Sequence, residues 1–505
     1  MSGAKTIIFF PHVNARNNSS GQEEDMAARR IFQRIGAKSA LCLFMVVAAD
    51  ALFYDQPVGW TLGLYAGLVL GCIVLANINL IATGMGRLLA LAALILAINI
   101  FDRPNILSIL MFIFLLAVLL VSGKRAVLDD VRIWALDIWC LLGRLFLQWR
   151  FDWKLFAKLR KSKKIMASGF VRYTVLPVCL AVMFSYLFSL ANPVIASYFR
   201  QFDISALWSF SRLLFWVYFG VLIWGLLRPR FALSRAGGAR ALTRTHENID
   251  MWLSENSLKI SLLVFNLMFA VQNGLDIAFL WGGGTLPDGV SYAHYARAGA
   301  YPLIATTLIA AVYVLVAFGD ARAGRNDIYA RAGVYVWIAQ NVFLAFSAMA
   351  RLVAYIDAYK LTYLRTAALV WIGLIIIGMA LIIARIYLRK DNRWLTNVNA
   401  LVLVTVLYIC SFVNFGRFIA DYNVNRGLTH AAEGVPRVDI GYLRHIGPDA
   451  IPGLQKLLQQ NPPYATVVDQ EIKALTHKLV LQQEGNWRSW TWQRARLRDE
   501  VRQPD

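Results

Sequence analysis

Long apolar runs limit what this sequence can fold into more than any other feature. A helix needs about 20 apolar residues to cross the hydrocarbon core of a bilayer, and the 505 residues contain eleven runs of roughly that length. The runs are too long and too uniformly apolar for the alternating strands of an outer-membrane barrel. The sequence therefore predicts an all-α polytopic membrane protein with about eleven transmembrane helices. The runs lie at 39–54, 59–81, 87–101, 105–122, 170–191, 207–227, 258–281, 300–319, 333–353, 363–387 and 397–418.

The third run, 87–101, is the shortest, with 15 residues. It is either a full span or a short or tilted one. If it did not cross the bilayer, the direction of every helix before it would reverse.

The composition excludes several other classes of protein. Hydrophobic residues make up 58% of the chain and charged residues 16%, whereas soluble domains have about 45–50% and about 25%. This excludes a soluble enzyme, a disordered tail protein and a disulfide scaffold. The five cysteines have no metal-type spacing, and none lies in the polar tail, so we expect no disulfide framework. The first apolar run begins near residue 40, so no cleavable signal peptide is expected.

The basic residues predict the orientation of the helices. With the N-terminus inside, 29 Lys and Arg fall on inside segments and 4 on outside loops, as the positive-inside rule requires. Most of the net charge of +21 then faces the cytoplasm, which argues against nucleic-acid binding. The expected organisation is a cytoplasmic segment 1–38, a transmembrane domain 39–418 and an outside C-terminal tail 419–505, small and helical.

The longest inside loop, 123–167, combines apolar residues at helical spacing with four tryptophans and a basic end. This composition is typical of a helix that lies in the membrane interface against anionic lipid. One interpretation is a connecting helix held flat by its own hydrophobicity. The other is a docking surface for a cytoplasmic protein partner.

Polar and charged residues inside the spans are the main functional candidates, because they are costly in a bilayer. In the seventh span Asn273 and Asp276 share a helix face with Asn266, and in the ninth Asn341 and Arg351 form a second polar set. Asp276 and Arg351 should lie at similar depth near the outer surface. The two sets are either a clamp that holds helices together or a ligand-binding site. Two further charged residues, Asp50 and Arg212, fall in the first and sixth spans.

The loop after the seventh span is rich in glycine, tyrosine and turn signals. Its Tyr292 and Tyr295 resemble interfacial anchors. His294 with Asp288, Arg297 and Asp276 could instead form an outward-facing acid–base or ligand-binding cluster, and Tyr292 and Tyr295 are then candidate ligand-binding residues beside it.

Three glycines in the second span, Gly63, Gly67 and Gly71, fall four residues apart on one face, which predicts close helix packing. The chain contains no phosphate loop, nucleophile elbow or zinc-protease motif. We therefore predict no catalytic residue, metal site or cofactor.

Several segments resemble a bacterial inner-membrane family classified as a domain of unknown function of the 4153/4173 type. They are LFYDQPVGWTLGLY, the glycine- and tyrosine-rich stretch across the seventh and eighth spans, ARLVAYIDAYKLTYLR and DIGYLRHIGPDAIPGL, within residues 50–455. The resemblance implies a multi-pass protein of the inner membrane and no established reaction, substrate or cofactor. In such a membrane the outside tail 419–505 is periplasmic. Its pattern includes Gln272, Asn273, Asp276, Trp281, Gly282, Gly283, Tyr292, Tyr295, Arg297, Gly299, Arg351, Tyr355 and Tyr359.

Three functions follow as hypotheses. The first is binding or transport of a small molecule or ion at a polar site in the outer half of the membrane. The second is a signalling or assembly component whose tail senses the envelope. The third is an envelope transferase that uses a lipid-linked donor. The sequence leaves the oligomeric state open, and membrane lipids are the expected partners.

Overall fold

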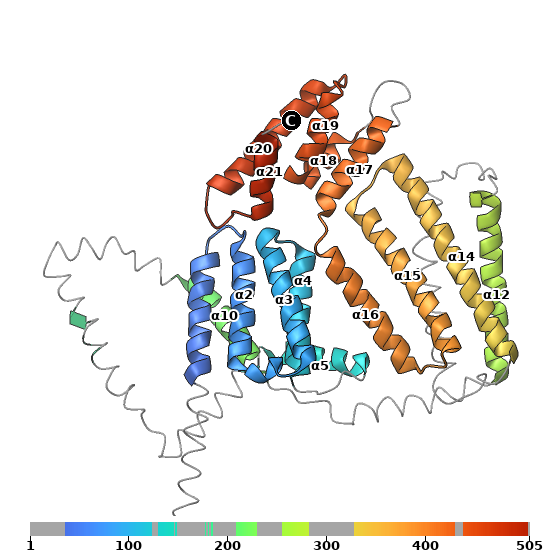
Figure 1. The fold of residues 1–505 in the computed structure, drawn as a ribbon, viewed down its shortest axis with the longest axis horizontal. Coiled ribbons are helices and arrows are strands. Elements are labelled where there is room, and N and C mark those ends of the chain that lie inside the picture. Colours follow the sequence, from blue (N-terminus) through green and yellow to red (C-terminus); the bar gives the residue numbers. More distant parts are fainter. Residues whose placement is uncertain are drawn as a thin grey trace, which may run out of the picture.

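The computed structural model describes residues 36–123, 130–145, 147–148, 209–229, 255–281, 328–429 and 438–502, with four isolated positions between 177 and 184. Within these ranges every regular element is a helix. The helices form a long bundle, with a separate group of short helices at one end that we call the cap (Figure 1). We refer to the two ends of the bundle as the cap end and the α5 end.

Among the described residues, five apolar helices make up the N-terminal half of the bundle. Their shared core contains Met45, Leu96, Ile100 and Leu119, each almost completely buried. A short 3-10 turn, η1 (Ile78–Ile81), follows the second helix. The five helices are Gly36–Phe53, α2 (Thr61–Ala76), α3 (Gly84–Asp102), α4 (Ile106–Ser122) and α10 (Phe210–Leu227).

In the part of the chain that the structure describes, the C-terminal half contains α12 (Glu255–Asp276), α14 (Ile328–Tyr359) and α15 (Tyr363–Tyr387). A single π-helical turn, η3 (Ile277–Trp281), extends α12 at the cap end. Helix α16 (Asn392–Cys410) lies between the halves and contacts both α15 and α4. The Tyr408 hydroxyl donates to the Ala92 carbonyl at 3.1 Å, which fixes α16 against α3.

Short polar side chains begin most of these helices. Thr83 accepts a hydrogen bond from the Gly86 amide at 3.0 Å, and Asn105 accepts one from the Ser108 amide at 2.7 Å. Asp391 does the same for the Trp394 amide at 2.9 Å. Such caps satisfy backbone N–H groups that have no partner inside the helix, so the chain can turn between consecutive apolar helices.

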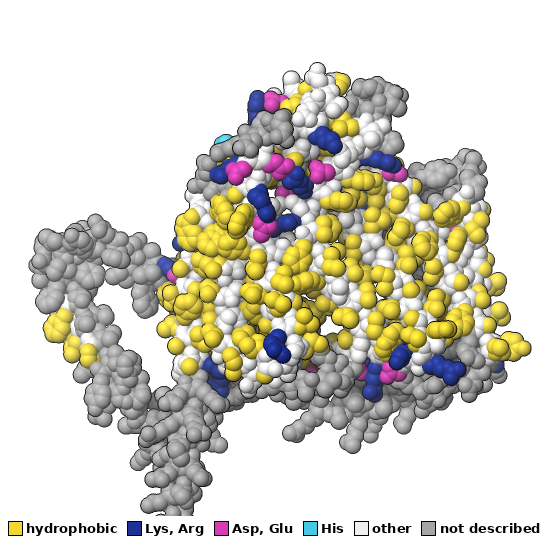
Figure 2. Space-filling view, in the orientation of Figure 1, with side chains coloured by type: hydrophobic (Ala, Val, Ile, Leu, Met, Phe, Trp, Pro, Cys, Tyr) yellow, Lys and Arg dark blue, Asp and Glu magenta, His cyan; other side chains and the backbone are white. Residues whose placement is uncertain are grey.

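An apolar band crosses the visible face of the bundle (Figure 2). On the face seen in Figure 2, hydrophobic side chains cover the middle of the helices, and Lys, Arg, Asp and Glu gather on the cap and along the opposite edge. This distribution, with helix lengths that match the bilayer core, indicates an integral membrane protein. Six described helices are long and apolar enough to cross a membrane: Gly36–Phe53, Gly84–Asp102, Phe210–Leu227, Ala332–Tyr359, Tyr363–Tyr387 and Asn392–Cys410.

Helix α5 (Val131–Leu145) lies across the end of the bundle rather than along it (Figure 1). Its own residues Trp134 and Leu141 are buried, and α5 contacts α4, α10 and α16. On its other side Trp139 is 76% exposed. The helix is therefore two-sided, as the tryptophans of the 123–167 loop predict, although the rest of that loop lies outside the described residues.

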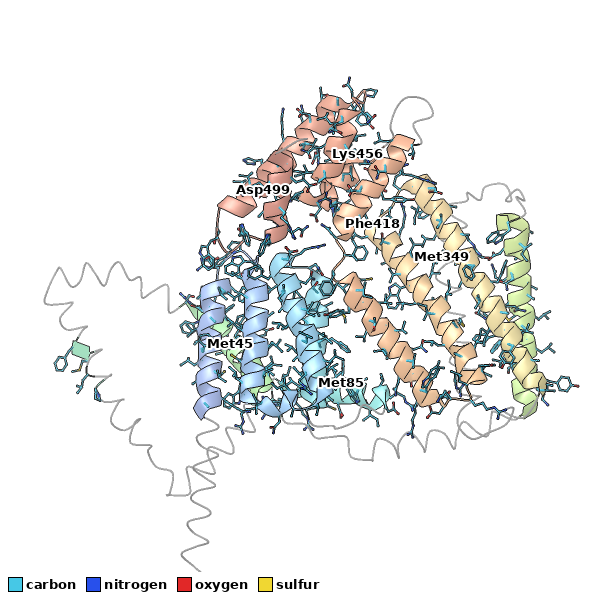
Figure 3. All side chains as sticks on the ribbon, in the orientation of Figure 1. Met45, Met85, Met349, Phe418, Lys456 and Asp499 are labelled. Atoms are coloured by element: carbon cyan, nitrogen blue, oxygen red, sulfur yellow. The ribbon has the colours of Figure 1, made fainter. Side chains whose placement is uncertain are left out.

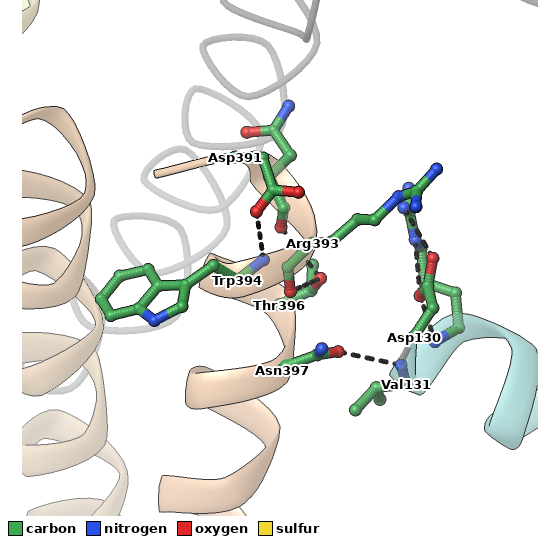
Figure 4. A network of polar contacts seen from close by, with 9 residues as sticks. Asp130, Val131, Asp391, Arg393, Trp394, Thr396 and Asn397 are labelled. Carbon is green, nitrogen blue, oxygen red and sulfur yellow. Dashed lines mark hydrogen bonds and ion pairs between the residues drawn. The ribbon is translucent and has the colours of Figure 1, made fainter. Parts of the chain in front are cut away.

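A network of polar contacts attaches the start of α5 to the start of α16 (Figure 4). Asn397 of α16 accepts a hydrogen bond from the Val131 amide at 2.9 Å. Asp130 forms an ion pair with Arg132 at 3.0 Å. The hydrogen bond with Arg132, together with its charge and that of Arg393, lowers the pKa of Asp130 despite partial burial. The carboxylate at this junction is therefore held in its charged form.

The cap contains five helices and a 3-10 turn, with a core of its own. Leu443, Ile451, Leu454, Val468 and Leu479 are fully buried in it. Lys456 and Asp499 lie in the cap, and Met85 marks the α5 end of the bundle (Figure 3). The elements are α17 (Phe415–Thr429), α18 (Ile440–Ile446), η4 (Pro448–Ala450), α19 (Ile451–Gln459), α20 (Ala465–Glu484) and α21 (Trp492–Arg502).

The structure refines several predicted spans. The marginal run 87–101 belongs to α3, a full helix of 19 residues. Helix α14 has 32 residues and is longer than the predicted 333–353. The last run, 397–418, ends at Cys410, because the chain turns at 411–414 and α17 begins at Phe415. The second run, 59–81, is helical as α2 and then η1. The runs 170–191 and 300–319 lie outside the described residues, apart from the isolated helical positions in the first.

Of the three glycines predicted to pack on one face of α2, Gly63 meets α3 directly. A Cβ atom at Gly63 would overlap the backbone of Phe101. At Gly67 and Gly71 a Cβ atom would meet nothing within 4 Å. Close approach of backbones in this part of the bundle therefore depends on the first glycine.

Candidate functional site

Helices α12 and α14 run parallel, and the side chains of two asparagines in α12 hydrogen-bond the backbone of α14. The Asn266 Nδ2 donates to the Gly333 carbonyl at 2.9 Å, and the Asn273 Nδ2 donates to the Gln340 carbonyl at 3.1 Å. Both contacts join residues 67 positions apart. Because the two asparagines are seven residues apart, they repeat with the period of a left-handed helix pair. We call this row of contacts the polar seam.

The seam ends at an ion pair near the cap end. The Arg351 Nη2 donates to the Asp276 Oδ2, and the Gln272 Nε2 donates to the other carboxylate oxygen at 3.1 Å. The Asp276 side chain is 0% exposed and that of Arg351 is 6% exposed. Burying two such charged groups is costly unless they compensate each other, and here the two side chains are in direct contact.

Several buried oxygens along the seam have no hydrogen-bond donor among the described residues. They include Oδ1 of Asn266, Asn273 and Asn341. The Asn341 residue is 1% exposed, and its Nδ2 donates to the Trp337 carbonyl at 2.7 Å. In each of the three amides the nitrogen faces a backbone carbonyl, which fixes the oxygen as the free acceptor. Such an unmet acceptor costs about 1–3 kcal/mol, and native proteins contain few of them.

Trp281 and Ser347 lie close together across the same pair of helices. The Trp281 Nε1 donates to the Ser347 hydroxyl at 3.3 Å, and Ser347 is fully buried. One helix turn from Asn341, the indole nitrogen of the fully buried Trp337 has no acceptor in the described part of the chain. The seam thus contains both unmet acceptors and an unmet donor.

The structure brings together four of the residues that the sequence singled out: Asn273, Asp276, Asn341 and Arg351 all belong to α12 and α14 and are buried. The predicted equal depth of Asp276 and Arg351 agrees with their direct contact. The other candidates, Tyr292, Tyr295 and Arg297, lie outside the described residues.

A second ion pair lies at the cap end of the N-terminal half. The Arg212 Nε donates to the Asp50 Oδ1 at 2.7 Å, and the Trp216 Nε1 donates to the same oxygen at 2.9 Å. The guanidinium of Arg212 also stacks over the Tyr54 ring, 4.9 Å from its centroid. Ser209 and Ser211 hydrogen-bond the Tyr54 hydroxyl and lower its pKa. The Asp50 carboxylate therefore already accepts hydrogen bonds from the guanidinium of Arg212 and the indole of Trp216.

No group of three or more His, Cys, Asp or Glu side chains that could hold a metal ion occurs among the described residues. What the seam offers is amide oxygens and one carboxylate–guanidinium pair. These groups can bind a polar solute or an ion.

The sequence profile of a family described as a domain of unknown function, DUF4153, matches residues 40–457. The chain belongs to this family. The DUF4153 region takes in the whole bundle and the cap as far as α19, so both ion pairs and the polar seam lie within it. No curated protein and no solved structure matches the chain.

Some seam residues in the DUF4153 region were missed by sequence reasoning. Ser347 and Trp337 lie within an apolar run, where a serine or a tryptophan is an ordinary residue. Their positions on α14 become significant once the register with α12 is known. A signal was available in the seven-residue spacing of Asn266 and Asn273, which recurs in their partners Gly333 and Gln340.

Proposed function

We propose that this DUF4153 protein is a multi-pass protein of the bacterial inner membrane that binds and transports a small polar solute or ion at the polar seam. The proposed topology has eleven spans, the N-terminus in the cytoplasm and the cap in the periplasm. The excess of Lys and Arg on the segments assigned to the inside supports this orientation.

The observation that carries the proposal is the row of buried amide oxygens without donors, next to the Asp276–Arg351 pair. A seam that served only to hold two helices together would gain most from complete hydrogen bonding. Unmet acceptors beside a buried carboxylate are instead the groups that a cation or an N–H or O–H donor requires.

In the proposed site a charged solute replaces one or both partners of the Asp276–Arg351 ion pair. Because Asp276 and Arg351 neutralise each other, the empty site has no net charge from this pair. A solute carboxylate can take the place of Asp276 on Arg351, or a cation can take the place of Arg351 on Asp276. Each exchange alone adds one charge to the bundle, so only a solute that carries both a carboxylate and a cationic group, one for Arg351 and one for Asp276, preserves the charge balance and keeps the bound and free states close in free energy.

The test measures ligand-dependent thermal stability of the purified full-length protein. Sodium, potassium, lithium, ammonium and a set of amino acids and dicarboxylates are compared with choline gluconate at equal ionic strength. A ligand present at 100 times its Kd stabilises the folded state by about 2.7 kcal/mol. We expect at least one probe to raise the melting temperature of the wild type.

Variants identify the site of that effect. Asn273→Leu and Asn341→Leu should abolish the shift. Asn399→Leu should keep it, because Asn399 of α16 makes the same kind of bond to the carbonyl four residues earlier, at 2.9 Å, but lies away from the seam. The proposal fails if no probe shifts the wild type, or if the seam variants respond as strongly as Asn399→Leu. Uptake of the active probe into proteoliposomes then separates transport from binding: its absence refutes the transport part.

A further inference from the structure

A cavity of about 500 Å³ lies at the α5 end of the N-terminal half, where several apolar helices end. The first turn of the helix Gly36–Phe53, the end of α2, the turn η1 and the end of α4 line it. We call it the η1 cavity. Of its apolar side chains, Leu80 and Leu120 are buried, whereas Leu75 and Ile78 are 70% and 60% exposed. The η1 cavity therefore has a buried apolar wall and opens to the surface beside two exposed apolar side chains.

Lys38 places a positive charge at the η1 cavity. Its Nζ donates to the Asn77 Oδ1 at 2.8 Å and to the Leu227 carbonyl at 2.9 Å. Asn77 is held in turn, because its Nδ2 donates to the same Leu227 carbonyl at 3.2 Å. Both acceptors are neutral oxygens, so these two contacts fix the position of the ammonium group and do not cancel its charge. The η1 cavity thus combines apolar walls with a cation in a defined place.

The position of Lys38 along the bundle indicates what surrounds the η1 cavity. It lies in the first turn of a helix that is long and apolar enough to cross a membrane, and α2 and α4 end at the same level, at Ala76 and Ser122. In Figure 2 Lys and Arg side chains gather along this edge of the apolar band. A lysine at the end of a membrane helix extends its amine toward the headgroups. A bilayer around the apolar band therefore brings lipid phosphates to the mouth of the η1 cavity.

We propose that the η1 cavity binds an anionic phospholipid, with its phosphate at the ammonium group of Lys38 and an acyl chain along Leu75 and Ile78. The exposed Asn79, which lines the same cavity, adds a side-chain amide that can donate to a phosphate oxygen.

Two properties of the η1 cavity select this ligand. The positive charge favours lipids with a net negative charge, because basic pockets between membrane helices attract anionic headgroups. The exposed apolar side chains favour a lipid over free phosphate, since only the lipid can cover them with apolar surface. This site is separate from the polar seam and stands independently of the function proposed there.

The experiment measures the melting temperature of the full-length protein in detergent micelles that contain short-chain phosphatidylglycerol. Phosphatidylcholine with the same acyl chains and inorganic phosphate are the comparison probes, at equal ionic strength. Phosphatidylglycerol at about 100 times its Kd should raise the wild-type melting temperature by about 2–3 °C. Lys38→Gln, which keeps a hydrogen-bond donor and removes the charge, should lose this response, and Lys38→Arg should keep it.

A second variant leaves the contacts of Lys38 in place. Asn79→Asp puts a negative charge on an exposed residue at the η1 cavity and should also lose the response. Lys390→Gln is the matched control and should respond like the wild type. Lys390 is exposed at the same end of the bundle, between α15 and α16, but does not line the η1 cavity.

The comparison probes and the variants can each overturn the proposal. Equal phosphatidylglycerol shifts in the wild type, Lys38→Gln and Asn79→Asp would place the binding elsewhere. An equal wild-type shift with phosphatidylcholine would exclude recognition of the lipid charge, and a full response to inorganic phosphate would assign a free anion instead of a lipid. The absence of any wild-type shift with phosphatidylglycerol would mean that the η1 cavity does not bind such a lipid.

Discussion

At the scale of single residues, Arg351 and Arg212 have different surroundings inside the bundle and should respond differently to substitution. Arg351 is nearly inaccessible and faces one carboxylate, whereas Arg212 is 18% exposed and stacks on aromatic rings as well. Asp276 thus depends on Arg351 more than Asp50 depends on Arg212, because the side chains of the first pair are almost completely buried, whereas those of Asp50 and Arg212 are 15% and 18% exposed.

A double-mutant cycle tests the Asp276–Arg351 pair. Arg351→Gln leaves a buried carboxylate uncompensated and should reduce the free energy of unfolding by about 3–5 kcal/mol. The double variant Asp276→Asn with Arg351→Gln should recover much of this loss, because neither group is then charged. Unfolding in mixed micelles gives the values.

The matched control for that cycle is the pair Asp102–Arg496, whose side chains are 26% and 62% exposed. There a single substitution should cost under about 1 kcal/mol. If Arg351→Gln were as mild as Arg496→Gln, or if the double variant were no better than the single one, Asp276 and Arg351 would not be coupled.

Sequence reasoning reached these charged residues because a charge inside an apolar run is conspicuous. It identified Asp50, Arg212, Asp276 and Arg351 individually, and it could place the last two at one depth from the expected direction of their helices. It could not pair Asp50 with Arg212, because 162 positions separate them and nothing in either run encodes which helices become neighbours.

At the scale of elements, the contact between α2 and α3 depends on one glycine. Gly63→Ala places a Cβ atom against the backbone of Phe101, which cannot move without shifting α3. Overpacking of this kind costs about 1–3 kcal/mol. Gly67→Ala and Gly71→Ala meet open space and should be neutral or stabilising by up to about 1 kcal/mol, because alanine favours the helix. Melting temperatures of the three purified variants test this order, and a Gly63→Ala protein as stable as the other two would contradict it.

The helices themselves could be predicted largely from the lengths of the apolar runs. The errors occur at helix ends, which are not determined by the length of an apolar run. The end of the last run was placed at residue 418 because Phe412 and Val413 continue its apolar character. The structure ends α16 at Cys410, and Asn414 accepts a hydrogen bond from the Arg417 amide at 3.1 Å at the start of α17. A capping residue thus decided the boundary against the hydropathy. The cap helices are amphipathic rather than apolar, and their packing follows from a core that forms between segments.

At the scale of the whole molecule, the cap joins the two halves of the bundle. On the N-terminal side the Trp60 Nε1 donates to the Trp487 carbonyl at 2.8 Å, and Arg496 pairs with Asp102 at 2.7 Å. On the C-terminal side Asn423 exchanges two hydrogen bonds with the backbone of Leu361, at 2.7 and 2.9 Å. Movement of α14 and α15 relative to the N-terminal half therefore has to be accommodated by the cap, whichever ligand the seam binds.

The orientation of the molecule can be tested with its own cysteines, because α5 and the cap lie at opposite ends of the bundle (Figure 1). Cys140 on α5 is exposed, and Lys473 in the cap has a side chain that is 75% exposed. In a cysteine-free background, Lys473→Cys should react in intact cells with a thiol reagent that cannot cross the inner membrane. Cys140, restored alone, should react after permeabilisation. Cys72, restored alone, is buried and should react in neither case, which shows that labelling reports exposure. Labelling of Cys140 in intact cells, with Lys473→Cys protected until permeabilisation, would invert the proposed topology and put the cap in the cytoplasm.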